Sequence, residues 1–185
     1  MRQIIVEGPD GAGKTTLVAQ LLDAFHSLQQ VKLFDSSGPR DGEHIRCRYE
    51  EIQQMAFPSG ITPLFDRYYP SELVYGPMLR GEVALNEQFV QQLAEEIRDN
   101  GLMIYCRPPL ETILERVGSD QMAGVHDHLV EIVKQYDIVM ALNSGGPFIT
   151  YDWTQKGAFR ELEDFVESYL NGWTWTAGRM KVSQP

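Results

Sequence analysis

The residues Gly8-Pro9-Asp10-Gly11-Ala12-Gly13-Lys14-Thr15 match the phosphate-binding loop pattern G-x-x-x-x-G-K-[ST] at every fixed position. The apolar run 4–6 stands just before this loop and predicts a buried strand. After the loop, apolar residues recur at helical spacing: Leu17, Val18, Leu21, Leu22, Phe25 and Leu28. A strand, a loop and a helix in this order are the setting that the motif requires, so the sequence predicts a site for a nucleoside triphosphate.

Each part of the loop contributes a different group for phosphate binding. The glycines allow successive backbone N–H groups to turn toward the β-phosphate, and the helix N-terminus adds partial positive charge. Lys14 can reach the β- and γ-phosphates, and the Thr15 hydroxyl can hold Mg²⁺. The residues expected to surround the bound donor nucleotide are Gly8, Asp10, Gly11, Ala12, Gly13, Lys14, Thr15 and Thr16.

Length and composition set limits on the rest of the molecule. A chain of 185 residues suits one domain, 1–185, with a core large enough to fold without disulfides or structural metals. The net charge of −10 and the lack of a basic stripe argue against nucleic acid as a partner. Cys47 and Cys106 match no metal or redox spacing. Without a signal peptide or an apolar run of about 20 residues, the sequence is expected to be cytoplasmic and not membrane-bound.

Short apolar runs alternate with helical patterns along the chain. The expected strands are 2–7, 31–35, 61–66, 101–106 and 147–151. The expected helices include 86–99, with Asn86 as N-cap, and the apolar-periodic stretches 110–117, 125–136 and 159–169. This alternation predicts an α/β fold, a five-stranded parallel sheet with helices on both faces. Ligands in such folds bind at the carboxyl ends of the strands.

A second polar group follows the strand expected at 61–66. Asp66 and Arg67 should emerge at its carboxyl end, beside the phosphate-binding loop. A carboxylate there can hold the Mg²⁺ shell or accept a proton from an attacking oxygen, and a guanidinium can bind an acceptor phosphate through two N–H groups. An ion pair on the surface is the alternative interpretation.

Three blocks of the sequence resemble the thymidylate kinases. The block 6–16 is similar to their E-G-x-D-G-A-G-K-T-T signature, and 66–81 resembles their D-R-Y-x-x-S-x-x-A-Y-Q-G-x-x-R-G segment. The block 105–116 is similar to the strand, proline pair and L-x-R that lead into their lid. The resemblance covers most of 2–140 in order and spacing. It implies a P-loop NTPase fold with a short lid, placed at about 117–128 in this chain.

The resemblance also implies roles for individual residues. Lys14 and Thr15 would serve the donor ATP, and Arg116 would lie against its adenine or phosphates as the lid closes. Asp66 would organise Mg²⁺ or the acceptor, and Arg67 would bind the acceptor phosphate. The expected catalytic residues are Lys14, Asp66, Arg67 and Arg116, and the expected metal ligands are Thr15 and Asp66.

Further residues are expected to bind the acceptor. Asp10 would meet the sugar 3′-hydroxyl of a deoxynucleotide, and Tyr75 is also expected to bind the acceptor. Arg40 follows the second strand, where this family often places an arginine for the acceptor. Thymidylate kinases commonly dimerise, so the helix 86–99 and a helix near Ser71 are candidates for a homodimer face.

The chain also departs from the family pattern. Some thymidylate kinases have a catalytic arginine at the position of Gly11, and those with glycine there supply arginines from the lid instead. The expected lid, 117–128, contains no arginine, which leaves Arg107, Arg116, Lys14 or Mg²⁺ to neutralise the transferred phosphoryl group. The pair Tyr75-Gly76 replaces Y-Q and removes a side chain that frames the acceptor base, so the base stays open and a purine is allowed. His126 and His128 are expected to be solvated.

The favoured function is an ATP-dependent kinase that converts a deoxynucleoside monophosphate to the diphosphate. The alternative is a deoxynucleoside kinase, which needs a general base near the 5′-hydroxyl; Glu7 and Asp66 are the candidates. A module that binds ATP without turnover is a third interpretation, but it would have little use for Asp10, Asp66 and Arg67.

Overall fold

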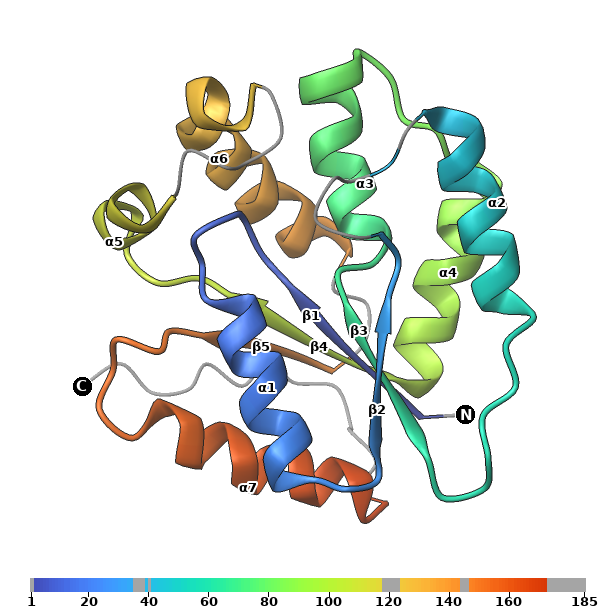
Figure 1. Cartoon of the computed structure of the whole chain (residues 1–185), viewed down its shortest axis with the longest axis vertical. Coiled ribbons are helices and arrows are strands. Elements are labelled where there is room, and N and C mark those ends of the chain that lie inside the picture. Colours follow the sequence, from blue (N-terminus) through green and yellow to red (C-terminus); the bar gives the residue numbers. More distant parts are fainter. Residues whose placement is uncertain (1, 35–38, 40, 118–123, 144–146, 173–185) are drawn as a thin grey trace.

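Five parallel strands form the centre of the molecule, in the order β2-β3-β1-β4-β5 (Figure 1). The computed structural model describes residues 2–34, 39, 41–117, 124–143 and 147–172. The strands are β1 (Gln3–Glu7), β2 (Leu28–Lys32), β3 (Thr62–Asp66), β4 (Gly101–Cys106) and β5 (Phe148–Tyr151). β1 occupies the middle of the sheet, paired with β3 on one side and β4 on the other.

Helices cover both faces of the sheet (Figure 1). One face carries α1 (Lys14–Ala24) and α7 (Ala158–Leu170). The other face carries α2 (Gly42–Gln53), α3 (Tyr69–Tyr75), α4 (Glu87–Asn100) and α6 (Val125–Asn143). A short π-helix, η1 (Gly76–Arg80), continues α3, and α5 (Leu110–Arg116) packs against α6.

The residues of β1 show why its sequence is apolar without interruption. Side chains alternate between the two faces of a strand, so Ile5 joins the core under α2, α3, α4 and α6, whereas Ile4 and Val6 join the core under α1 and α7. All three are fully buried. A parallel strand covered on both faces is expected to read as a continuous apolar run.

The second strand differs from the expectation. The apolar run predicted a strand at 31–35, but β2 is Leu28–Lys32, and Leu28, expected on the first helix, is its first residue. The helix α1 ends at Ala24, and Leu28 pairs with Thr62 of β3. β2 is an edge strand in which two glutamines, Gln29 and Gln30, follow Leu28, so its start carries no apolar run. The other four strands agree with the predicted ranges to within one residue.

The helices show a similar mixture of agreement and difference. The N-cap of α4 is confirmed, because the Asn86 side chain accepts a hydrogen bond from the Phe89 N–H at 2.8 Å. The helix α2 was not expected, because its many charged residues make the apolar periodicity weak in the sequence. The Asp41 side chain caps this helix by accepting a hydrogen bond from the His44 N–H. Leu114 was expected on the apolar side of α5 but is 46% exposed.

The topology brings several loops to one edge of the sheet. The phosphate-binding loop follows β1, Arg67 follows β3, Arg107 follows β4 and Trp153 follows β5. Because all strands run in the same direction, these positions meet at the carboxyl edge.

None of the described helices has the length and apolar character that a bilayer span needs.

Candidate active site

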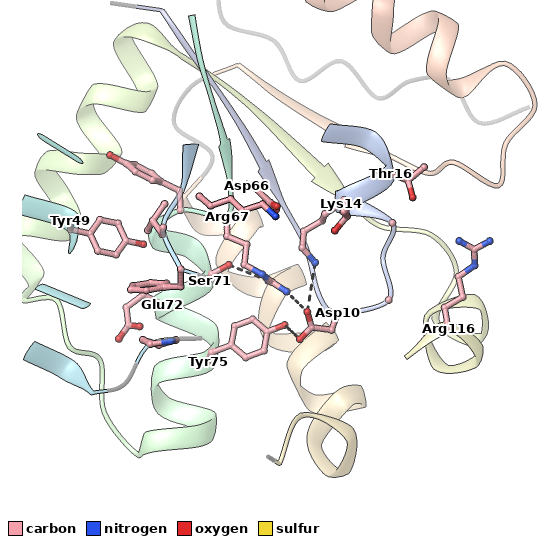
Figure 2. A pocket seen from close by; sticks show the side chains of 18 of the residues that line it. Asp10, Lys14, Thr16, Tyr49, Asp66, Arg67, Ser71, Glu72, Tyr75 and Arg116 are labelled. Carbon is pink, nitrogen blue, oxygen red and sulfur yellow. Dashed lines mark hydrogen bonds and ion pairs between the residues drawn. The ribbon is translucent and has the colours of Figure 1, made fainter. Parts of the chain in front are cut away.

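A cavity of about 630 Å³ opens at the carboxyl edge of the sheet. Its walls come from the phosphate-binding loop, the end of β3, and the helices α2 and α3 with η1. Figure 2 shows Asp10 and Lys14 close to Arg67 inside it, with Tyr49 and Glu72 on the opposite side. The volume lies in the range of about 300–1,000 Å³ that is usual for small-molecule sites.

Lys14 is the buried cation of the phosphate-binding loop. Its ammonium group donates a hydrogen bond to the Pro9 carbonyl at 2.6 Å and lies 3.9 Å from an Asp10 carboxylate oxygen. Thr15 and Thr16 are exposed and line the same cavity. Burial, followed by the neighbouring Arg67 guanidinium, lowers the pKa of Lys14 to about 8, although Asp10 acts in the opposite direction.

The lowered pKa of Lys14 predicts that a triphosphate binds with proton uptake. At pH 8 the free protein holds about half of this side chain neutral, and phosphate charge next to it should raise its pKa and complete its protonation. Calorimetric titration of ATP in buffers of different ionisation enthalpy should show that Lys14 contributes an uptake of about half a proton at pH 8, a contribution that vanishes near pH 6.

The variant Lys14→Arg is the control for this titration, because arginine stays protonated and any uptake by ATP itself remains. Equal proton uptake in the wild type and Lys14→Arg at pH 8 would show that Lys14 is already fully charged.

Arg67 has an unusual backbone. Its φ of 71° lies in the left-handed region, and it is the only non-glycine residue with positive φ among those that the structure describes. Its N–H donates to the Val6 carbonyl at 3.0 Å, which ties the end of β3 to the central strand. A long side chain rarely adopts this conformation, and such strain gathers at functional sites.

Hydrogen bonds hold the Arg67 side chain across the cavity. One guanidinium nitrogen donates to the Gly8 carbonyl at 2.9 Å, the Tyr136 hydroxyl at 2.8 Å and the Ser71 hydroxyl at 3.3 Å. The other nitrogen donates to the Asp10 carboxylate. The guanidinium is therefore aimed beside the phosphate-binding loop (Figure 2).

Asp10 is the carboxylate between the two cations. One of its oxygens faces Arg67 and Lys14, and the other accepts a hydrogen bond from the Tyr75 hydroxyl at 3.0 Å. Burial favours a raised pKa, but Arg67 and Lys14 outweigh it, so the pKa of Asp10 is lowered. The structure thus brings Asp10, Lys14, Arg67 and Tyr75 together in one cluster.

Glu7 lies under this cluster and does not line the cavity. Its fully buried carboxylate accepts from the Tyr68 N–H at 2.6 Å and the Ser71 hydroxyl at 2.8 Å. Burial raises the pKa of Glu7, although Arg67 acts against this. Glu7 therefore fixes the turn between β3 and α3 to the central strand, and its place is that of a structural anchor rather than a general base.

Arg116 and Trp153 form a second cluster on the far side of the phosphate-binding loop. The Arg116 guanidinium lies 4.0 Å from the centre of the Trp153 ring, and the Trp153 indole N–H donates to the Ala12 carbonyl at 3.1 Å. A smaller cavity of about 360 Å³ opens beside them, and Arg116 borders both cavities. Sequence reasoning missed Trp153, although its position directly after the fifth strand was a usable signal.

Other arginines expected near the transferred phosphoryl group differ in position. Arg107 donates two hydrogen bonds to Asp137, at 2.8 and 3.0 Å, so α6 already holds its guanidinium. A Cβ atom at Gly11 would lie 2.8 Å from the Ile113 carbonyl, so α5 occupies the space that a larger side chain would need. Of Arg107 and Arg116, Arg116 is therefore the one that lines the cavity.

Thr15, which carries a hydroxyl group, and Asp66, which carries a carboxylate, both line the cavity. Among the described residues, no group of three or more His, Cys, Asp or Glu side chains could hold a metal. This arrangement fits Mg²⁺, which in nucleotide sites keeps several waters and binds one or two protein oxygens together with substrate phosphates.

Some expected residues lie elsewhere. Arg40 and the lid segment 118–123 are outside the described residues. The described lid residues 125–128 form the first turn of α6, where Val125 is fully buried. His126 and His128 are exposed there.

Comparisons with known proteins agree with this architecture. No family model matches the chain. It is 23% identical over 190 residues to a guanylate kinase from Clostridioides difficile, covering 91% of this chain and 88% of that protein. It is 30% identical over 126 residues to a guanylate kinase from Rhodospirillum rubrum, covering 61% of this chain and 58% of that protein.

Several solved structures share the fold. The YorR protein of Bacillus subtilis, in complex with phosphorylated GDP, superposes with a TM-score of 0.68 at 20% identity, covering 90% and 96% of the two chains. Deoxyadenosine kinase from M. mycoides with bound dATP gives 0.62 at 15%, covering 92% and 100%. Thymidylate kinase from Candida albicans gives 0.61 at 14%, covering 95% of each. The predicted fold is confirmed: this is the α/β fold of the P-loop kinases.

Proposed function

We propose that this chain is an ATP-dependent kinase that transfers the γ-phosphoryl group to a deoxynucleoside monophosphate. The observation that carries this proposal is the convergence of two cations, Lys14 and Arg67, on one cavity, with Asp10 between them. Transfer between two phosphates needs positive charge on both the donor and the acceptor side. Lys14 supplies the donor side, and Arg67, on the neighbouring strand, supplies the acceptor side.

The comparisons support the reaction class and leave the acceptor open. The two relatives are named guanylate kinases, and the structural neighbours include a thymidylate kinase and a deoxyadenosine kinase. These names share phosphoryl transfer to a nucleoside or nucleotide and differ in the acceptor. The side chains that line the cavity therefore carry the choice of acceptor.

Catalysis in this proposal comes from positioning and charge. Lys14 binds the donor phosphates, Arg67 orients the acceptor phosphate, and Arg116 with Trp153 holds the donor from the outer side. Asp10 and Tyr75 contact the acceptor sugar. Mg²⁺, held by Thr15 and Asp66, would neutralise charge that develops on the phosphates.

A deoxynucleoside kinase is the second candidate. It is favoured by the number of hydrogen bonds that the Arg67 guanidinium already donates within the protein. Its guanidinium donates to Asp10, Gly8, Ser71 and Tyr136, which leaves fewer N–H groups for an incoming phosphate. Such an enzyme needs a base beside the 5′-hydroxyl, and since Glu7 is enclosed, Asp66 on the cavity wall is the residue to test.

A substrate panel tests the proposal. ATP consumption is measured with every common nucleoside monophosphate and nucleoside, both ribo and deoxy, and the products are identified by chromatography. We expect a diphosphate from one or two monophosphates and no monophosphate from any nucleoside. Monophosphate formation from nucleosides would overturn the proposal in favour of the second candidate, and ATP consumption with no acceptor dependence would overturn both.

A further inference from the structure

The loop after β5 places Trp153 against the outer side of the phosphate-binding loop. The indole N–H donates a hydrogen bond to the Ala12 carbonyl at 3.1 Å, between residues 141 positions apart in the chain. A Cβ atom at Gly13 would lie only 2.8 Å from the indole nitrogen and 2.9 Å from the neighbouring ring carbon. The edge of the indole ring therefore rests directly on the main chain of the phosphate-binding loop.

The turn that carries Trp153 is held by its own hydrogen bonds. The Asp152 side chain accepts from the Thr154 N–H at 3.0 Å, from the Thr154 hydroxyl at 2.7 Å and from the Gln155 side-chain amide at 3.0 Å. The Arg116 guanidinium covers one face of the indole ring, 4.0 Å from its centre. The indole is thus fixed both through its backbone and through one face of its ring.

The Ala12 carbonyl depends on the hydrogen bond from Trp153. Ala12 is fully buried, and no other donor among the described residues reaches its carbonyl oxygen. A buried carbonyl without a partner costs free energy of folding. The next residue is Gly13, with a φ of 89°, and a glycine allows the peptide group before it to rotate at little cost. The indole N–H therefore sets the orientation of the peptide group between Ala12 and Gly13.

The orientation of this peptide group decides where the Gly13 N–H points. The peptide is trans, so its C=O and its N–H point in opposite directions. Because the Ala12 carbonyl points toward Trp153, the Gly13 N–H points to the inner side of the loop. Gly13 lines the large cavity, and in the described part of the chain its N–H has no hydrogen-bond partner. This N–H is therefore free to donate to a phosphate oxygen.

We infer that Trp153 is a positioning residue for the donor phosphates, an inference that rests on the ATP site of the proposed function. Its indole N–H holds the Ala12 carbonyl, and this hydrogen bond turns the Gly13 N–H toward the phosphates. The same ring packs against the Arg116 guanidinium, which borders both cavities. One side chain thus fixes the phosphate-binding loop and Arg116 relative to each other.

The variant Trp153→Phe gives the first test, because phenylalanine keeps an aromatic ring and lacks the N–H. Calorimetric titration without an acceptor measures the Kd of two probes, each with Mg²⁺: the non-hydrolysable ATP analogue AMP-PNP and inorganic tripolyphosphate. We expect each Kd to rise about 5-fold, the scale of one neutral hydrogen bond. A loss of affinity for AMP-PNP alone would make Trp153 a platform for the base and would overturn the inference.

Tyr169→Phe is the matched control. The Tyr169 hydroxyl forms hydrogen bonds with the carbonyls of Gln3 and Asn100 at the amino end of the sheet, so this change also removes an aromatic donor from the main chain. Thermal unfolding reports the stability of both variants. Only Trp153→Phe should weaken AMP-PNP binding. An equal rise of this Kd in both variants would assign Trp153 a purely structural role.

The wild-type protein gives a second test that needs no substitution, and it decides the question if Trp153→Phe folds poorly. Hydrogen exchange is followed by NMR after labelling tryptophan and glycine with ¹⁵N. The Trp153 indole N–H should be protected with and without AMP-PNP, whereas the Gly13 amide should become protected only when AMP-PNP is bound. An indole N–H that exchanges as fast as that of free tryptophan would overturn the inference.

The outcomes separate this inference from the function on which it rests. Both probes bind without an acceptor, so failure to phosphorylate any monophosphate would overturn the proposed reaction and leave the role of Trp153 standing. An unchanged Kd for both probes in folded Trp153→Phe would overturn the inference and leave the kinase intact. A wild-type protein that binds neither probe would overturn both.

Discussion

Replacing Lys14 with alanine should lower kcat by roughly 10³-fold, the scale measured when one preorganised electrostatic group is removed from a transition state. The ammonium is buried at the phosphate-binding loop, and in the proposed reaction it is the cation on the donor side of the cavity. Its loss removes the charge that meets the phosphates, while the backbone N–H groups of the loop remain. Phosphoryl transfer, measured as ATP consumed per enzyme with the preferred acceptor, is the readout.

The same substitution should not destabilise the protein at pH 7. The pKa of Lys14 falls from 10.5 in the unfolded chain to about 8 in the fold, so folding opposes its protonation. This penalty is present below pH 8 and is removed as the pH rises toward 10.5, because the unfolded state then binds more protons than the folded state. Between pH 8 and pH 10.5, the free energy of unfolding of the wild type should therefore rise relative to that of Lys14→Ala.

Thermal unfolding across this pH range checks the prediction, with Lys134→Ala, an exposed lysine of α6, as control. A Lys14→Ala protein that unfolds at a much lower temperature than wild type at pH 7 would assign Lys14 a structural role. Retained turnover in a folded variant would remove it from catalysis.

The sequence predicted the features that depend on neighbours along the chain. The phosphate-binding loop, the strand before it and the helix after it are local, and the buried strand at 101–106 reads directly from its apolar run. The start of β2 was missed because Leu28 pairs with Thr62, 34 positions away, and this pairing rather than apolar content decides where the strand begins. Helix α2 was missed because only Ile45, Tyr49 and Ile52 are buried among many charged residues.

In the candidate site, the sequence likewise predicted the positions of residues along the chain but not the contacts of their side chains. Asp66 and Arg67 were placed correctly at the end of β3, because parallel strands share one carboxyl edge. That Arg67 pairs with Asp10 and reaches Tyr136 of α6 follows from tertiary packing, which one sequence does not reveal.

Replacing Arg67 with alanine should raise KM for the monophosphate acceptor by about 30- to 100-fold, the cost of truncating one partner of a buried charge pair. KM for ATP should change by less than about 3-fold, since Lys14 and the loop backbone hold the donor. The acceptor KM of Arg67→Lys should lie between those of the wild type and Arg67→Ala, because lysine keeps the charge and loses the two-nitrogen geometry. Initial rates with each substrate varied in turn give both constants.

The difference between the effects on the two KM values shows whether Arg67 binds the acceptor phosphate or only supports the structure. Arg67 also holds Asp10, whose lowered pKa depends on it, so the alanine variant should raise the pKa of Asp10. If Arg67 only braced the loop, its loss would raise both KM values in parallel and lower the unfolding temperature more than Arg98→Ala, a change at an exposed arginine of α4. If it binds the acceptor phosphate, the effect stays with the acceptor and is largest for monophosphates. A nucleoside acceptor, which carries no phosphate, would show little change in KM, so this one variant also decides between the two candidate reactions.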